Sequence, residues 1–316
     1  MSSAVPDRSS DPQPFRVSDA LAQGVGAGRL RGADLERPFH GIRIPVGVET
    51  TPEHAYAPLL RTGDRFSHTS AARLWAAPLP GWVGPTVHVT ASPGTVRPRG
   101  KGVHGHEGGG VTAALREGLP VSDPPTMFLE LATLLRLEEL VAVGDHLIHR
   151  PRIPQPGDTR PHLDRDELCE WLDHSTARGV ARARAAAALL RPGVESPRET
   201  RLRLLLLGTG MPEPVCGLEI GDEFGPIGWF DLVWPDWKVA AEYDGDQHRT
   251  SDAQYERDIR RFDRAAAAGW SVVRVRKHGL AAGRSETIAR VASALRRGGC
   301  PDVFPNRRKP LVQTLR

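Results

Sequence analysis

The stretch GWFDLVWPDWKVAAEYDG, residues 228–245, decides the fold of the last third of the chain. Its runs WFDLVW and KVAAEYDG predict two strands joined through the residues PDWK. If the two middle residues of PDWK form the turn, antiparallel pairing places Asp231 opposite Glu242, with both side chains on one face. Asp244 shares that face because side chains alternate along a strand. The register depends on this turn, since a slip of one residue would reverse the faces.

Carboxylates that face each other across a strand pair point to a bound cation. They repel each other, and burying them unpaired costs several kcal/mol. Mg²⁺ binds carboxylate oxygens and keeps waters, one of which can attack a phosphodiester. We therefore expect Asp231 and Glu242 to bind Mg²⁺ or Mn²⁺. The alternative is that both are ordinary surface carboxylates on an amphipathic hairpin.

Further elements are predicted on both sides of the hairpin. A helix capped by Ser196 carries Glu199 in its first turn and stops at Gly208. Glu199 either closes the cap or joins the acidic residues. VCGLEI predicts a strand, and a long helix, a buried strand and a final helix follow within 251–297. The expected order over residues 195–297 is α-β-β-β-α-β-α.

This order of motifs resembles a known class of nuclease. FDLVWPDWKVAAEYDGDQHR, ERDIRRFDRAAAAGW and VVRV together resemble the Vsr-like endonuclease domain of the PD-(D/E)xK superfamily. The resemblance implies a restriction-endonuclease-like core in which Asp231 and Glu242 bind metal. It also implies that Glu199 completes the acidic cluster and that His248 lies near the scissile phosphate. Asp258 and Arg274 match positions that recur in such domains; we count Asp244 among the candidate catalytic residues.

The motif departs from the superfamily pattern at its last position. E-x-K reads E-Y-D here, starting at Glu242, so the lysine that orients or activates the water is missing. Vsr-like relatives also lack it. His248, Gln247 and Lys277 are candidate substitutes. The departure leaves open a domain that keeps the fold and binds DNA without cutting it.

Arginine supplies most of the positive charge. The net charge of +4 and the pI near 9.2 permit nucleic-acid binding without requiring it. Arginine suits phosphate contacts, although the codon bias of a GC-rich genome is the plainer explanation for its abundance. The arginines that we predict to contact DNA are Arg249, Arg260, Arg261, Arg274, Arg29 and Arg31.

The N-terminal region has the outline of a winged helix-turn-helix. A helix that Ser18 can cap, a Gly-rich turn, a second short helix over RLRGADLERPF and the strand HGIRIP follow one another within 15–49. SDALAQGVGAGRLRGADLERPFHGIRIP, HTSAARLWAAPLP and GLPVSDPPTMFLELA resemble AbiEi-type antitoxins and transcriptional regulators over roughly residues 15–150. That resemblance implies DNA binding through the helix-turn-helix, with a cognate toxin as partner.

The chain as a whole is predicted to be α/β, or α+β overall, with several segments. We expect a disordered tail at 1–14, a winged helix-turn-helix at 15–49, a mixed α/β antitoxin-like region at 50–150, a linker and helix at 151–194, the nuclease-like domain at 195–297 and a tail at 298–316.

Other features bound the class of protein. The three cysteines lie far apart and predict reduced thiols. No apolar run reaches the length of a membrane span, and the first fifteen residues lack a signal core, so we expect a soluble cytoplasmic protein without a membrane partner. His104 and His106 would share one face of a strand and could bind metal. Without a Cys or carboxylate cluster beside them, surface histidines are the favoured interpretation.

Two functions follow from these observations. The first is a Mg²⁺-dependent DNA endonuclease in repair or defence, delivered by the helix-turn-helix. The second is an AbiEi-type regulator whose nuclease-like domain is not catalytic. Either protein could form a homodimer.

Overall fold

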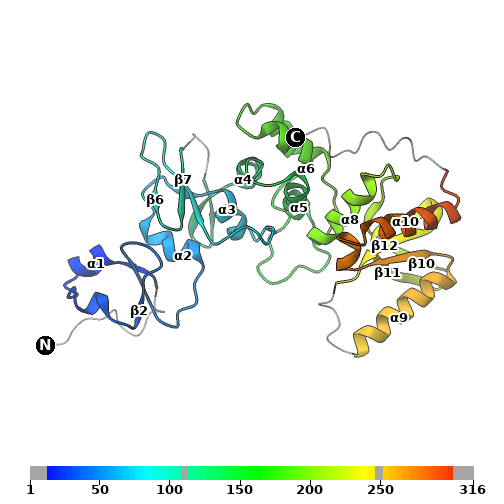
Figure 1. Cartoon of the computed structure of the whole chain (residues 1–316), viewed down its shortest axis with the longest axis horizontal. Helices are drawn as coiled ribbons and strands as arrows, with labels where there is room; N and C mark the ends of the chain where they lie inside the picture. The colour runs from blue at the N-terminus through cyan, green and yellow to red at the C-terminus, as the bar shows by residue number, and fades with distance from the viewer. Residues whose placement is uncertain (1–12, 109–112, 246–251, 302–316) are drawn as a thin grey trace. The chain divides into compact units, whose positions relative to one another are not determined.

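The computed structural model describes residues 13–108, 113–245 and 252–301, and it has a mixed α/β fold with several sheets (Figure 1). The chain divides into two compact units, 1–131 and 132–316. Helices α5 to α7 therefore belong to the same unit as the predicted nuclease-like segment. Within the described ranges, no helix is both long enough and apolar enough to cross a bilayer.

The first unit begins with a small three-stranded sheet in the order β1-β3-β2. The central strand β3 buries Ile42 and Ile44 against Ala55 of helix α2. The elements of this part are β1 (Phe15–Arg16), α1 (Val17–Ala22), η1 (Arg29–Arg31), β2 (Leu35–Glu36), β3 (Ile42–Pro45) and α2 (Pro52–Tyr56).

The second helix expected in the N-terminal region is absent, so the predicted helix-turn-helix outline is wrong for residues 13–50. The segment forms only the 3-10 turn η1, which ends at Gly32, and then strand β2. Burial of Leu35 in the sheet outweighs the local helix preference. Ser18 caps nothing, because its hydroxyl bonds to Asp19.

A six-stranded sheet in the order β6-β7-β5-β4-β9-β8 completes the first unit. Its pairs β4–β9 and β5–β7 are parallel, and the others are antiparallel. The elements are η2 (Ala57–Leu59), β4 (Arg65–Phe66), α3 (His68–Leu74), β5 (Val87–Thr90), β6 (Arg99–Gly100), β7 (Val103–His106), β8 (Ala113–Arg116), β9 (Leu119–Ser122) and α4 (Pro124–Leu131).

The second unit begins with three helices, α5 (Leu137–Ile148), α6 (Arg165–Asp173) and α7 (Val180–Ala188). Asp164 caps α6 by accepting hydrogen bonds from two backbone amides. Helix α5 packs on helix α8, where Asp145 and Arg203 form a fully buried ion pair with an oxygen–nitrogen distance of 2.9 Å.

The rest of the second unit has the predicted order α-β-β-β-α-β-α. Its strands form one sheet in the order β10-β11-β12-β13, in which only the last pair is parallel. The elements are α8 (Pro197–Leu207), β10 (Val215–Asp222), β11 (Gly225–Trp234), η3 (Pro235–Trp237), β12 (Val239–Tyr243), α9 (Asp252–Ala267), β13 (Ser271–Val275), η5 (Lys277–Leu280) and α10 (Arg284–Arg297).

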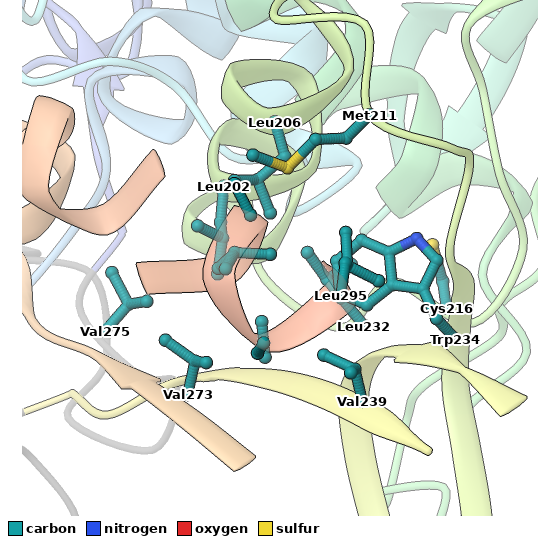
Figure 2. Packing of buried hydrophobic residues seen from close by; sticks show 14 of the residues in the cluster. Leu202, Leu206, Met211, Cys216, Leu232, Trp234, Val239, Val273, Val275 and Leu295 are labelled. Atoms are coloured by element: carbon teal, nitrogen blue, oxygen red, sulfur yellow. The ribbon is translucent and has the colours of Figure 1, made fainter. Parts of the chain in front are cut away.

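Helices cover both faces of this sheet (Figure 1). On one face, Leu202 and Leu206 of α8 and Leu295 of α10 pack on Leu232 and Trp234 of β11 (Figure 2). On the other face, α9 covers a smaller core that includes Phe230 and Val233. The sheet therefore lies between two layers of helices.

The hairpin of β11 and β12 has the predicted register. Leu232 pairs with Ala241, and the pairing of the two strands ends there, one position short of Asp231 and Glu242. The connection is longer than the assumed two residues, because η3 and the residue after it form a four-residue turn. The assumed two-residue turn and the observed four-residue turn are both centred between residues 236 and 237, so they give the same register.

Candidate active site

Three elements bring the predicted carboxylates together at one end of the sheet. Glu199 lies in the first turn of α8, Asp231 in β11 and Glu242 in β12. Glu199 is buried, and the other two are partly buried. The charges of Glu199 and Glu242 both act on Asp231, so the three form one electrostatic cluster.

Asp231 lies where the two strands separate. Its Oδ2 accepts a hydrogen bond of 2.6 Å from the backbone N–H of Tyr243. Burial raises the pKa of Asp231 well above its ordinary value, and the negative charges of Glu199 and Glu242 raise it further. The N–H of Tyr243 and the charge of Arg261 oppose this shift. Keeping Asp231 ionised in the folded protein therefore costs free energy.

Glu242 has one satisfied and one unsatisfied oxygen. Its Oε1 accepts from the guanidinium of Arg261 on α9. Its Oε2 is buried and has no hydrogen-bond partner among the described residues. Burial raises the pKa of Glu242, and Arg261 lowers it. A buried carboxylate oxygen without a donor is rare, because its desolvation is uncompensated.

Arg261 is fixed in place beside Glu242. It donates to the carbonyl of Trp229 at 2.7 Å, and its guanidinium lies 4.7 Å from the ring centre of Phe230. Gly228 makes room for it, since a Cβ there would lie 2.9 Å from the Arg261 Cδ. The sequence predicts that Arg261 contacts DNA. In the structure, Arg261 pairs with Glu242 and balances its charge.

Glu199 fulfils both of the roles that the sequence left open. Its N–H donates to the Ser196 hydroxyl at 3.3 Å, which caps α8. Its Oε2 accepts from the N–H of Glu195 at 2.8 Å, one residue earlier than in a standard capping box. Burial raises the pKa of Glu199, and its negative charge raises the pKa of Asp231.

Asp244 does not join the acidic cluster as predicted. It accepts from Arg274 at 2.8 Å and from Arg276 at 3.3 Å, so its charge is already balanced. Its backbone N–H bonds to Val275, which holds it at the end of the parallel pair. Arg274, a predicted DNA contact, is thus engaged with Asp244, although it is exposed.

The remaining predicted residues lie outside this cluster. Arg260 is exposed and pairs with Glu256 on the same helix, and Arg29 pairs with Asp34 in the first unit. Arg31 is exposed in the first unit, and Lys277 is exposed in η5. Gln247, His248 and Arg249 lie outside the described residues.

The carboxylates do not form a compact three-residue ligand set. Among the described ranges, the group of three whose ligand atoms all lie within 4.8 Å of one another is His68, His88 and His106, in the first unit. A cation held by Asp231 and Glu242 stays a prediction, and Glu199 acts on Asp231 through its charge. A pocket of about 490 Å³ lies apart from these carboxylates, between α5 and α6.

Two arginines beside the cluster were not among the predicted site residues. Arg198 is exposed, and its guanidinium lies 5.7 Å from the ring centre of Tyr243. Arg152 stacks at 4.4 Å over Trp229 and pairs with Glu195. Arg198 could have been found from its place next to Glu199 at a helix start. Arg152 comes from a distant irregular segment that carries no sequence signal.

Replacing Asp231 with Asn is expected to stabilise the metal-free protein at neutral pH. A carboxyl whose folded pKa is raised favours the folded state below its unfolded pKa of about 3.9. That contribution is lost as the pH rises through the folded pKa. Asn removes the buried charge and can still accept from Tyr243.

Thermal unfolding in EDTA measures this effect. We expect a rise in Tm of roughly 2–4 °C, the change for about 1 kcal/mol in a domain of this size. The difference should shrink as the pH falls from neutral toward the unfolded pKa of about 3.9, because wild-type Asp231 takes up its proton on the way. A variant that is less stable than wild type at neutral pH would contradict the inference that ionised Asp231 destabilises the folded, metal-free protein.

Comparison with known proteins leaves the function open. No family model matches the chain. Two uncharacterized proteins of Mycobacterium tuberculosis, from strains CDC 1551 / Oshkosh and ATCC 25618 / H37Rv, are each 30% identical to it over 96 residues. The match covers 30% of this chain and 35% of each relative, so the chain spans about a third of the length of the curated relatives it matches.

Proposed function

We propose that residues 195–297 form a restriction-endonuclease-like core that hydrolyses phosphodiester bonds in DNA with the help of Mg²⁺ or Mn²⁺. The observation that carries this proposal is the buried Glu242 Oε2 without a donor, next to Asp231. A divalent cation would offset the electrostatic cost of two partly buried carboxylates on the neighbouring strands of a hairpin. Perturbed carboxyl pKa values also cluster at functional sites.

The arrangement of elements supports the proposal. Two antiparallel strands carry Asp231 and Glu242, a preceding helix carries Glu199, and a parallel strand closes the sheet. This is the order that the PD-(D/E)xK resemblance implies. The apolar clusters on the two faces of the sheet do not include these carboxylates.

The ligands of the cation would be Asp231 and Glu242. Asp231 keeps Oδ1 available, because Oδ2 accepts from Tyr243, and Glu242 keeps Oε2 available, because Oε1 accepts from Arg261. Neither existing contact has to break. Bound Mg²⁺ would supply a nucleophilic water and neutralise charge on the phosphate. The negative charge of Glu199 would act on Asp231 and favour a bound cation there.

Arg261 is the cation that pairs with Glu242, the glutamate of the motif. In the E-x-K pattern the lysine stands two positions after the glutamate, where this chain has Asp244. The structure puts a guanidinium from α9 against Glu242 instead. We infer that Arg261 holds Glu242 ionised and oriented. Arg198 and Arg152 would then contact phosphate groups flanking the site, since arginine forms such contacts readily.

Plasmid cleavage by the purified full-length chain tests the proposed function. We expect nicked or linear product with Mg²⁺ or Mn²⁺ and none with EDTA, because water activation needs the cation. The protein should first be dialysed against EDTA and then reloaded with one metal at a time. Cleavage that persists in excess EDTA would overturn the assignment.

The regulator alternative lacks structural support in the N-terminal region. It needs a recognition helix within 15–49, whereas this segment contains a single α-helix of six residues and a 3-10 turn. DNA binding in a gel shift, without cleavage under any metal, would favour this alternative over the nuclease.

A further inference from the structure

Four histidines come together in the first unit, away from any function proposed above. His88 lies on β5, His104 and His106 lie on β7, and His68 is the first residue of α3. Parallel pairing of β5 with β7 sets His88 beside His104 and Thr90 beside His106. Side chains at alternate positions share a face, so this register gathers the strand histidines on one side.

The nitrogen atoms of three of these rings are close together. One ligand atom from each of His68, His88 and His106 lies within 4.8 Å of the other two. The His88 Nδ1 and His106 Nε2 are 3.0 Å apart. Two imidazole nitrogens on a tetrahedral Zn²⁺ are about 3.4 Å apart, from bond lengths of about 2.1 Å. Modest ring rotations would therefore complete such a site.

The backbone at His68 is held in an uncommon conformation. Its φ of 50° lies in the left-handed region, which costs a residue other than glycine roughly 1–3 kcal/mol. A hydrogen bond of 2.9 Å from its N–H to Glu130 Oε2 holds it there. This conformation directs the ring against His106, with ring centres 3.6 Å apart.

The outer contacts suit a metal ligand. The His68 Nδ1 lies 3.0 Å from the Ser67 hydroxyl and 3.8 Å from Glu130 Oε2. These acceptors favour a proton on Nδ1, which leaves Nε2 free to bind a cation. Glu130 is in turn held by Ser122 at 3.1 Å and by Arg65 at 3.5 Å.

The protonation state also suits a metal ligand. Burial and, to a smaller extent, the neighbouring imidazoles lower the pKa of His68 to about 2, of His88 to about 3 and of His106 to about 4. Imidazole binds metals in its neutral form, which its ordinary pKa of about 6.5 already favours at pH 7. Two nearby arginines are balanced, Arg65 by Glu130 and Arg73 by Glu53. The third, Arg97, is exposed to solvent.

A polar atom without a partner lies on the same face. Thr90 is the register partner of His106 and is 2% exposed. Its hydroxyl makes no hydrogen bond among the residues that the structure describes. A water on a cation held by the histidines would give this hydroxyl a partner. Burying a hydroxyl without one costs about 1–3 kcal/mol.

We propose that His68, His88 and His106 bind one divalent transition-metal ion, with Zn²⁺ as the expected ion. Imidazole nitrogens suit zinc, whereas the carboxylate oxygens of the second unit suit magnesium. Three histidines leave a fourth position for water or an outside group. His106 is only partly buried, so an ion can reach the site from solvent.

Calorimetric titration of the EDTA-treated, dialysed full-length chain with ZnCl₂ tests the proposal. We expect one equivalent bound to the first unit, and the same equivalent in the Asp231→Asn variant, which separates this site from the acidic cluster. Co²⁺ in place of Zn²⁺ should give the visible absorption of a nitrogen-ligated ion. His106→Gln should weaken binding at least about 100-fold, since even outer contacts are worth about 10–100-fold.

Two further variants sharpen the result. His104 is exposed and stacks on His106 but is outside the three-residue group, so His104→Gln is the matched control and should bind within about 3-fold of wild type. Glu130→Gln should weaken binding by about 10–100-fold. Circular dichroism of each variant confirms folding. A wild type that binds no Zn²⁺, or equal binding by His106→Gln and His88→Gln with the fold intact, would overturn the proposal.

Discussion

Asp231→Asn is expected to lower the rate of DNA cleavage by at least about 10³-fold, equivalent to about 4 kcal/mol of transition-state stabilisation. Loss of one of two carboxylate ligands weakens the cation that activates water and neutralises the phosphate. Asn has the same shape and can accept from the Tyr243 N–H, so the hairpin should stay intact. Single-turnover cleavage of a plasmid in Mg²⁺ measures the loss.

The same hairpin offers a matched control for this variant. Asp236 is an exposed carboxylate in the turn, and Asp236→Asn should cut at the wild-type rate. A folded Asp231→Asn protein with undiminished cleavage would remove Asp231 from the site. Because this variant should be more stable than wild type in EDTA, its loss of activity cannot be attributed to unfolding.

Arg203→Met is expected to destabilise the second unit by about 3–5 kcal/mol, the usual result of removing one partner of a buried ion pair. Asp145 accepts from Arg203 at 2.9 Å, from Thr200 at 2.8 Å and from the Arg191 N–H at 2.8 Å. Both charged side chains are almost completely buried. The substitution leaves the carboxylate without its countercharge, and Tm should fall by roughly 6–20 °C.

Arg201 supplies the matched control for this variant, because it is exposed on the same helix. Arg201→Met should change stability by less than about 0.5 kcal/mol. The double variant Asp145→Leu/Arg203→Met should recover part of the loss, since apolar residues of similar size often replace buried ion pairs well. A melting temperature unchanged by Arg203→Met would show that the pair contributes no stability.

The elements of the second unit could be predicted from sequence because their signals are local. Ser196 caps α8 through the N–H of Glu199, and alternation marks β11 and β12. The register of β11 against β12 follows from symmetry about the turn, which holds for a turn of two or of four residues.

Contacts between distant segments could not be predicted in this way. Asp244 shares the expected strand face, yet its partners Arg274 and Arg276 come from β13 and the residue that follows it. Arg261 could be placed on a helix but not against Glu242. The segment expected as a second N-terminal helix instead pairs Leu35 with Pro45, because strand pairing buries more apolar surface there.

The histidine cluster shows the same limit. His104 and His106 could be placed on one strand face, because they are two positions apart. Their neighbours His68 and His88 are brought in by the parallel pairing of β5 with β7 and by the start of α3. Without that pairing, two histidines two positions apart on one strand carry no metal-ligand spacing.

The central claim is that the carboxylates of the hairpin hold a cation that cleaves DNA. Its most direct test is plasmid cleavage by wild type and Asp231→Asn, purified in parallel and assayed in Mg²⁺ and in EDTA. The account predicts cleavage by wild type in Mg²⁺ alone, and at least about 10³-fold less by the variant. Equal cleavage by both proteins, or cleavage by wild type in EDTA, would contradict it.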